Sequence, residues 1–240
     1  MGKKGGGMKL KRQLAPPFWE ISRKKPRFVL KPRPGTHSNK FSYPLGIVLR
    51  DILKKTLTNR ETILVLNEGK IKVDGKVITN THHGVGLMDV VEILPTGETF
   101  RFVPQNGKPL HPLAIDEKEK NLKLLKITSK VLIKKGFFQY GFHDGKTLVS
   151  KDDYKVGDTC LVNLPKIEVK QHFELKQGAT TVIIRGENAG SVGKIEEIKS
   201  GQFSLPRRSL ISINERVIES PISIVMAIGN REWVIGHKGE

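Results

Sequence analysis

From about residue 105 to its end, the sequence consists of short apolar runs separated by turns that contain glycine or proline, and none of it predicts a helix. The runs include FFQYGFHDGKTLVS, with Asp144-Gly145 at a hairpin turn, then DTCLVNLP, IEVKQHFEL and GATTVIIRG. Short strands at close spacing with such turns are typical of small barrels and sandwiches. We therefore expect a central β domain over residues 105–176 and a small five-stranded barrel over residues 177–240.

Residues 42–104 have a different pattern, which begins with apolar residues at helical spacing. Ser42 is the expected N-cap of this first helix, and Pro44 is tolerated in its first turn. The expected apolar stripe consists of Leu45, Val48, Leu49, Ile52 and Leu53.

A second short helix follows, because Thr58 and Glu61 have the spacing of a capping box and Gly69 can end the helix. Asp74-Gly75 lies between alternating runs and predicts a hairpin. GLMDVVEIL and ETFRFV read as two further strands. The predicted fold class is therefore α+β, mostly β, with a two-helix-plus-sheet domain before the β units.

Positive charge is concentrated at the start of the chain. The sequence holds 42 Lys plus Arg against 24 Asp plus Glu, a net charge of +18, which favours a polyanionic partner. Residues 1–40 contain twelve Lys or Arg, one acidic residue and five prolines, interleaved with Phe18, Trp19 and Phe28. Like charge and proline oppose collapse, whereas aromatic rings can stack on bases. We expect residues 1–41 to form a basic, Pro-rich arm that is extended alone and ordered on RNA.

The candidate RNA-binding residues are basic side chains of this arm, of the polar side of residues 42–104 and of the loop over residues 185–194, with one tryptophan and one asparagine. An ordinary solvated surface is the alternative for the second group, and the adjacent arm favours RNA. The full set is Lys3, Lys4, Lys9, Lys11, Arg12, Trp19, Arg23, Lys24, Lys25, Arg27, Lys31, Arg33, His37, Lys40, Arg50, Lys54, Lys55, Arg60, Lys70, Lys72, Lys76, Arg185, Asn188 and Lys194.

The stretch GENAGSVGK ends in Gly-Lys, as phosphate-binding loops do, but it departs from the Walker pattern. Asn188 stands where the first glycine belongs, and Ile195 replaces the hydroxyl residue that would bind magnesium. We therefore predict no ATP or GTP binding. We interpret Gly186, Gly190 and Gly193 as turn glycines with positive φ, in a loop that presents Arg185, Asn188 and Lys194 outward.

Other classes of function have little support in the sequence. We find no nucleophile elbow, zinc-protease motif or paired-cysteine motif, and His82-His83 lacks a nearby third ligand, so we expect no catalysis, metal or cofactor. The single cysteine, Cys160, fits a reducing cytoplasmic setting. No apolar run approaches the roughly 20 residues that span a bilayer, so we expect no membrane association.

Two segments resemble known RNA-binding motifs. GATTVIIRGENAGSVGKIEEI, residues 178–198, resembles a KOW motif, which implies an SH3-like barrel. Residues 42–94, with LRDIL, EGKIKVDGKV and VGLMDVVEI, look like an S4-type RNA-binding domain.

With MKLKRQLAPPFW, KPRPGTHS and the central FHDGKTLVSKDDYKVGDTCLVNLP, the order resembles the S4e family of archaeal and eukaryotic small-subunit ribosomal proteins, over residues 8 to about 200. The chain looks like an archaeal member. The resemblance implies a ribosome-bound structural protein whose partners are small-subunit rRNA and neighbouring ribosomal proteins, without a small-molecule substrate. A transcription elongation factor with a KOW barrel is the alternative, which the basic arm disfavours.

Overall fold

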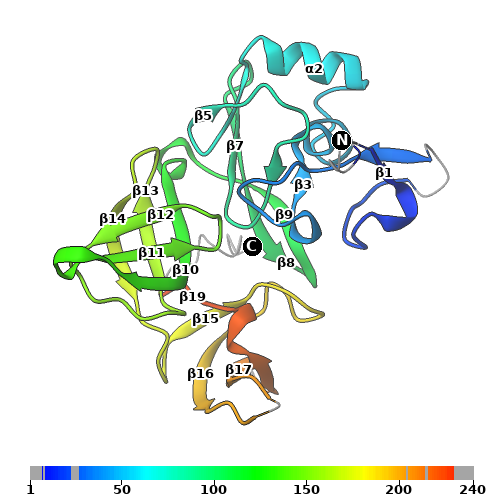
Figure 1. Cartoon of the computed structure of the whole chain (residues 1–240). Coiled ribbons are helices and arrows are strands. Elements are labelled where there is room, and N and C mark those ends of the chain that lie inside the picture. The colour runs from blue at the N-terminus through cyan, green and yellow to red at the C-terminus, as the bar shows by residue number, and fades with distance from the viewer. Residues whose placement is uncertain (1–6, 8, 23–26, 204, 214–215, 230–240) are drawn as a thin grey trace, which may run out of the picture.

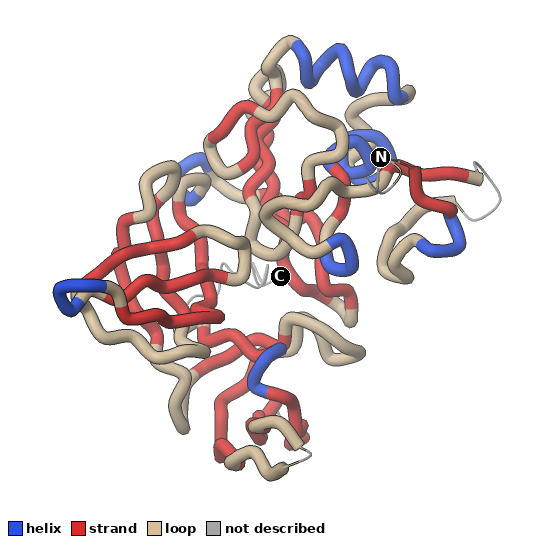
Figure 2. Tube along the Cα trace, viewed as in Figure 1, coloured by secondary structure: helices blue, strands red, loops and turns tan. Residues whose placement is uncertain are grey.

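The structure, a computed structural model, describes residues 7, 9–22, 27–203, 205–213 and 216–229. Within these residues the chain is mostly β, with two short α-helices and three five-stranded antiparallel sheets (Figures 1 and 2). The predicted α+β, mostly β class is confirmed at this level.

The first sheet has the strand order β5-β4-β7-β8-β9. Its turn at Asp74-Gly75 is the predicted hairpin, and both residues have the positive φ, 51° and 76°, that such a turn requires. The sheet continues through β9, beyond residue 104 where the second segment was expected to end. Its strands are β4 (Ile71–Val73), β5 (Lys76–Val77), β7 (Val90–Ile93), β8 (Glu98–Gln105) and β9 (Lys108–Ala114).

The second helix, α2 (Asn59–Asn67), begins as predicted. The Thr58 hydroxyl accepts a hydrogen bond from the Glu61 backbone N–H at 3.2 Å, and the Glu61 carboxylate accepts one from the N–H of Leu57 at 2.7 Å. Two donors at the helix start are thus satisfied reciprocally, as in a capping box. Gly69, at φ 70°, follows the helix end.

The first helix differs from the expectation of a regular helix capped by Ser42. It consists of α1 (Leu45–Ile47) and a π-helical turn, η3 (Val48–Ile52), with a hydrogen bond from the Leu53 N–H to the Val48 carbonyl. Pro44 occupies the N-cap position, because Ser42 instead donates its hydroxyl to the Ser38 carbonyl. The apolar stripe still packs into the core.

The described part of the N-terminal segment is folded, which corrects the expectation of an extended arm. Strand β1 (Lys9–Lys11) pairs with β2 (Phe28–Leu30), and the Trp19 ring stacks on Tyr43 with centroids 5.9 Å apart. The indole N–H of Trp19 donates to the Ser42 carbonyl. Burial of these rings in the core of the first sheet offsets the repulsion between like charges. The same region contains η1 (Arg12–Leu14), η2 (Asn39–Phe41) and a short pair of β3 (Tyr43–Pro44) with β6 (Gly84–Val85).

The central sheet has the order β12-β11-β10-β13-β14 and is organised around the long strand β10 (Leu122–Leu132). One half of β10 pairs with β13 and the other half with β11, with a bulge between Ile127 and Ser129. The predicted turn at Asp144-Gly145 joins β11 to β12. The remaining elements are η4 (Glu117–Glu119), η5 (Lys134–Gly136), β11 (Phe138–Phe142), β12 (Thr147–Ser150), β13 (Thr159–Asn163) and β14 (Glu168–Phe173).

The C-terminal sheet has the order β18-β17-β16-β15-β19 and lies below the central sheet in Figure 1. An apolar cluster joins all three sheets. Val103 comes from the first sheet and Met88 from the turn before its strand β7, Leu124 and Leu161 from the central sheet, and Val182 and Met226 from the C-terminal sheet. The C-terminal elements are β15 (Thr180–Ile183), β16 (Val192–Lys199), β17 (Arg208–Ile213), β18 (Arg216–Pro221), η6 (Ile222–Ile224) and β19 (Val225–Ala227).

The glycine-rich loop between β15 and β16 packs against the turn of the β8–β9 hairpin. The Gly107 N–H donates to the Ala189 carbonyl at 2.9 Å. Gly186 and Gly190 have φ of 92° and 91°, as expected of turn residues, but Gly193 lies within β16. A Cβ on Gly193 would stand 2.3 Å from the Ser212 carbonyl oxygen, so this glycine permits close strand packing and is not a turn residue.

Replacing Gly190 with alanine is expected to destabilise the protein by on the order of 2 kcal/mol. The new Cβ would lie 2.6 Å from the Cα of Gln105, at a φ that already strains any side chain. Gly186→Ala is the matched control, because it has the same φ and nothing within 4 Å of its Cβ. Urea unfolding measures both variants, and equal losses would mean that the packing against Gln105 adds nothing.

Candidate nucleic-acid interface

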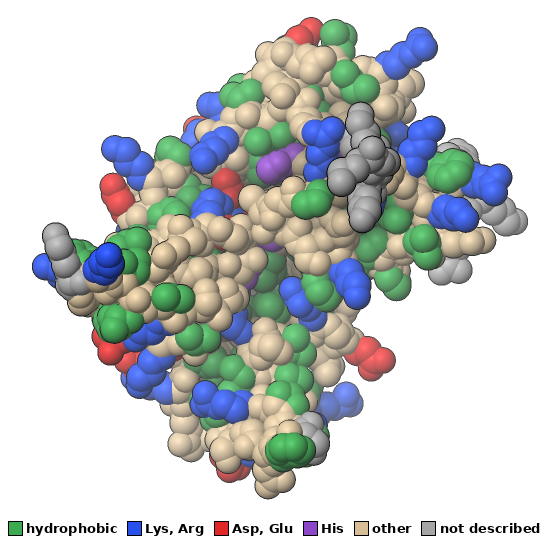
Figure 3. All heavy atoms as spheres, viewed as in Figure 1, with side chains coloured by type: hydrophobic (Ala, Val, Ile, Leu, Met, Phe, Trp, Pro, Cys, Tyr) green, Lys and Arg blue, Asp and Glu red, His purple; other side chains and the backbone are tan. Residues whose placement is uncertain are grey.

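Many of the predicted RNA-binding cations lie on the surface without a carboxylate partner. Their side chains make no hydrogen bond or ion pair within the described residues, so their charge is available to an external anion. Figure 3 shows Lys and Arg side chains spread over the visible face, with few acidic side chains between them. The unpartnered set is Lys9, Lys11, Lys31, Lys40, Lys54, Arg60, Lys72, Lys76 and Lys194.

Other members of the predicted set already have protein partners. Arg50 is paired with Asp51 at 2.7 Å, Lys55 with Glu98 at 2.5 Å and Lys70 with Glu68 at 2.5 Å. Arg12 donates to the carbonyls of Ile21 and Ser22. Such partly exposed pairs contribute little to stability, but they reduce the positive potential that these side chains offer to RNA.

Three further candidates of the described chain are exposed at the surface, and Arg185 is partly buried. Arg27, Arg33 and Asn188 are exposed, and the Arg27 guanidinium lies 5.7 Å from the centroid of the Phe28 ring. Arg185 is half-buried beside Phe41. Five predicted residues, Lys3, Lys4, Arg23, Lys24 and Lys25, lie outside the described residues.

Two predicted RNA-binding residues, Trp19 and His37, are buried in this structure, so each offers little surface to RNA. Trp19 is 3% exposed and packs within the chain's own core, so its faces are closed to a base. His37 is 8% exposed, and its Nε2 lies 2.9 Å from the Asp89 carboxylate. Long-range packing decided both positions, because aromatic and imidazole rings suit a core as well as an RNA surface.

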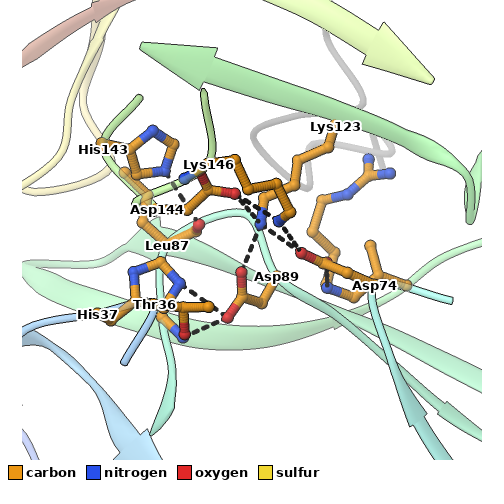
Figure 4. Close-up of polar contacts among 12 residues, drawn as sticks. Thr36, His37, Asp74, Leu87, Asp89, Lys123, His143, Asp144 and Lys146 are labelled. Atoms are coloured by element: carbon orange, nitrogen blue, oxygen red, sulfur yellow. Dashed lines mark hydrogen bonds and ion pairs between the residues drawn. The ribbon is translucent and has the colours of Figure 1, made fainter. Parts of the chain in front are cut away.

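A buried ionic network, which the sequence analysis missed, connects the N-terminal segment, the first sheet and the central sheet (Figure 4). At its centre the Lys123 Nζ lies 2.7 Å from Asp74, 2.5 Å from Asp89 and 3.1 Å from Asp144. Lys146 adds a second ammonium, 2.7 Å from Asp74 and 2.6 Å from Asp144. Lys123 is fully buried, so the network is an internal clamp and contributes no RNA-binding surface.

The electrostatics of the network follow from burial and from the opposing charges. Burial alone would lower the pKa of Lys123, but the three carboxylates hold that pKa well above its ordinary value. Burial would likewise raise the pKa of Asp144, yet Lys123 and Lys146 lower it to about 2. The pKa of Asp89 is also held well below its ordinary value, because His37 and Lys123 outweigh its burial. The network is therefore ionised at neutral pH.

Nearby polar side chains complete the connection between the sheets. Burial and the charge of Lys123 lower the pKa of His143 to about 4, so this ring is neutral at pH 7. Lys126, also on β10, donates to the carbonyls of Ile222, Ser223 and Val225 at 2.6 to 2.9 Å. These bonds attach the central sheet to the C-terminal sheet.

One local signal for these contacts exists in the sequence. The run NLKLLKIT places Lys123 and Lys126 inside an otherwise apolar strand, where a lysine must find buried partners. The identity of those partners is not encoded locally, because Asp74 and Ile222 lie far from β10 in the chain.

The described residues contain no group of three or more His, Cys, Asp or Glu side chains that could hold a metal ion. Among the same residues, no helix is both long and apolar enough to cross a membrane. Gly193 and Lys194 lie inside strand β16, whereas a Walker loop would require a helix N-terminus directly after the lysine. The arrangement therefore offers exposed positive charge on a scaffold of β-sheets.

Comparisons with known proteins match nearly the whole chain. The family model described as ribosomal family S4e matches residues 96–169, and the model of the RS4NT domain matches residues 4–40. The chain is 40% identical over 234 residues to the small ribosomal subunit protein eS4 of Pyrobaculum arsenaticum, which covers 94% of this chain and 97% of that protein. It is 36% identical over 247 residues to the protein of the same name from Staphylothermus marinus, covering 98% and 97% of the two chains.

A solved structure shares the fold. The crystal structure of the 30S ribosomal protein S4e from Thermoplasma acidophilum aligns with a TM-score of 0.66 and 30% sequence identity. The alignment covers 79% of this chain and 94% of that chain.

Proposed function

The chain belongs to ribosomal family S4e, a structural component of the small ribosomal subunit, and we propose that its exposed cations bind the rRNA of that subunit. The proposal is carried by sequence similarity over nearly the full length to small-subunit proteins, together with nine predicted cations that have no carboxylate partner among the described residues. Phosphate oxygens of RNA are the counter-charge that such cations attract. The protein is ribosome-bound, and we place the ribosome in the cytoplasm.

We propose that the RNA-binding role is divided among the four segments predicted from the sequence. Residues 1–41 and 42–104 supply the largest group of unpartnered cations. Residues 177–240 form a KOW-containing SH3-like barrel, a proposal supported by the five strands and by the turn glycines Gly186 and Gly190. Residues 105–176 connect the two parts through Lys123 and Lys126 and face either RNA or a neighbouring ribosomal protein.

The alternative of a transcription elongation factor has weaker support. It would rest on the KOW-like segment alone, whereas the relatives named small ribosomal subunit proteins match the chain from the arm to the last sheet. An enzymatic role has no support from the described site chemistry. Co-sedimentation with small subunits or with RNA polymerase distinguishes the two binding roles.

Binding of purified protein to small-subunit rRNA is expected to weaken steeply with salt. Each phosphate that a cation neutralises releases counterions, so log affinity falls with log salt by roughly 0.7–0.9 per contact. Replacing Lys54, Arg60 and Lys76 together with glutamine is expected to reduce that slope, because these side chains have no partner in the described chain. Filter binding across a salt series gives the slope.

The matched control is Lys55→Gln, next to Lys54 in sequence. Lys55 is paired with Glu98, so its replacement removes less available charge and is expected to change the slope less. An affinity that does not depend on salt would contradict the proposed function itself. An unchanged slope in the triple variant would show that this surface is solvated and that other cations bind the rRNA.

A further inference from the structure

A small cavity opens where the N-terminal segment, the β8–β9 hairpin and the C-terminal sheet meet. Its volume is about 90 Å³. The residues that matter for its chemistry are His37, Ser38, Phe41, His143 and Arg185. Three of them come from the N-terminal segment, and Arg185 comes from the loop that follows β15.

Arg185 is the cation of this cavity, and Phe41 holds its orientation. The guanidinium carbon lies 3.5 Å from the centroid of the Phe41 ring, as in a stacked cation–π pair. Stacking occupies one face of the planar group and leaves its N–H donors in the plane free. A guanidinium held in this way is ordered before a ligand arrives, so less rotamer entropy is lost on binding.

The guanidinium has no counter-charge within the described residues. It makes no hydrogen bond or ion pair there, although it is partly buried, and burial lowers its pKa. Arg185 interacts electrostatically with another cation, Lys126, whose pKa is lowered to about 8 by burial and by the charge of Arg185. Lys126 directs its own donors to three carbonyls. The local potential is therefore positive, and an external anion would relieve it.

Of the other polar groups of the cavity, one fits an anion. The His37 ring forms a wall, because its Nε2 is bound to Asp89. Ser38 adds an exposed hydroxyl at the rim. His143 is already committed, because its Nδ1 accepts from the Lys126 N–H and its Nε2 faces the Leu87 carbonyl, so this ring forms only a wall.

We propose that Arg185, stacked on Phe41, binds a backbone phosphate of the rRNA in this cavity, with the Ser38 hydroxyl beside it. The proposal rests on the rRNA binding proposed above. It adds that a single phosphodiester group of the rRNA occupies this cavity. A planar guanidinium binds two phosphate oxygens at once, which a lysine ammonium cannot do. A contact of this kind depends on geometry as well as on charge.

The test is the full-length variant Arg185→Lys, compared with Arg185→Gln, in binding to small-subunit rRNA. Both are expected to weaken binding by about tenfold, because the lysine keeps the charge but loses the stacked fork. Arg208→Lys is the matched control. Arg208 lies outside the predicted RNA-binding set and is paired with Glu219, so a change to lysine is expected to leave the affinity as in the wild type. If Arg185→Lys binds with wild-type affinity, the proposed phosphate site is wrong, whereas the proposal that other cations bind the rRNA still stands.

A second measurement does not depend on the variants folding. Phenylglyoxal modification of Arg185 in the wild-type protein, read by mass spectrometry, is expected to be suppressed by bound rRNA and unaffected by inorganic phosphate at the same phosphate concentration. Equal modification with and without rRNA would overturn the proposal and would leave Arg185 available to a carboxylate of a neighbouring protein. Protection by inorganic phosphate alone would overturn it as well, because the ligand would then be free phosphate.

Discussion

Lys123→Met is expected to destabilise the protein by about 3–5 kcal/mol, the range found when one partner of a buried ion pair is removed. Methionine fills nearly the same volume, so the loss is electrostatic and does not come from a cavity. Asp74, Asp89 and Asp144 would remain buried with one ammonium fewer among them. The N-terminal segment, the first sheet and the central sheet would lose their shared clamp. Urea or thermal unfolding measures the loss.

The matched control is Lys176→Met, which removes an exposed pair. Lys176 and Glu174 lie 3.2 Å apart with most of the lysine side chain in solvent, so the expected loss is below about 1 kcal/mol. Similar losses in the two variants would mean that the network around Lys123 behaves like a surface pair and does not hold the sheets together.

The pH dependence of the free energy of unfolding distinguishes the loss of an ion pair in Lys123→Met from a packing defect. In the wild type the pKa of Asp89 and that of Asp144 are depressed, so their stabilising contribution is complete above the ordinary aspartate pKa and is lost as pH falls toward about 2. In Lys123→Met the two aspartates lack that ammonium, so their pKa values rise. Protonation then removes the free-energy cost of keeping a carboxylate buried with too few cations beside it. Mild acid should therefore narrow the difference in stability between the variant and the wild type.

The features that were predictable from sequence have local causes. Thr58 and Glu61 cap α2 because a hydroxyl and a carboxylate at that spacing reach backbone donors of the same turn. Asp74-Gly75 turns between β4 and β5 because both residues tolerate positive φ. In each case the interacting residues lie within a few positions in the chain, so the local sequence pattern is enough to predict the contact.

The features that were missed depend on contacts between distant segments. Gly193 is a glycine because β17 crosses close to it, which no local pattern reveals. His37 and Asp74 look like loop and turn residues, yet the fold brings both into the network around Lys123. Charge composition correctly predicted a basic surface, but it could not tell the unpartnered Lys54 from Lys55, which is bound to a glutamate on β8.

The N-terminal segment shows how this limit affects the proposed interface. Composition predicted an extended arm, because its charges repel and prolines block regular structure. The aromatic residues decide otherwise, since Phe18 and Trp19 both pack on Tyr43 of the first sheet. Lys9 and Lys11 are thereby held on an ordered hairpin, so part of the entropy of ordering the RNA-binding residues is lost in folding and not in binding.

Trp19→Ala is therefore expected to release this segment and to weaken rRNA binding together. Removing a buried aromatic side chain costs about 3–5 kcal/mol, and the hydrogen bond to the Ser42 carbonyl is lost with it. Trypsin should then cleave rapidly after Lys11 and Arg12 in the free variant, whereas the free wild type resists because Arg12 is bound to the carbonyls of Ile21 and Ser22. Limited proteolysis with and without rRNA, followed by filter binding, measures both effects.

Phe28→Ala is the control on the same hairpin, because this residue is 45% exposed and contributes little to the core. It should keep the resistance of the wild type to trypsin. Bound rRNA should restore protection from trypsin in Trp19→Ala, because phosphates then hold the cations that the core no longer positions. The affinity is lower because these residues become ordered only on binding, and binding bears that entropy loss. If free Trp19→Ala resists trypsin as the wild type does, pairing of β1 with β2 suffices to order the segment. A fall in affinity would then need an explanation other than the order that Trp19 imposes.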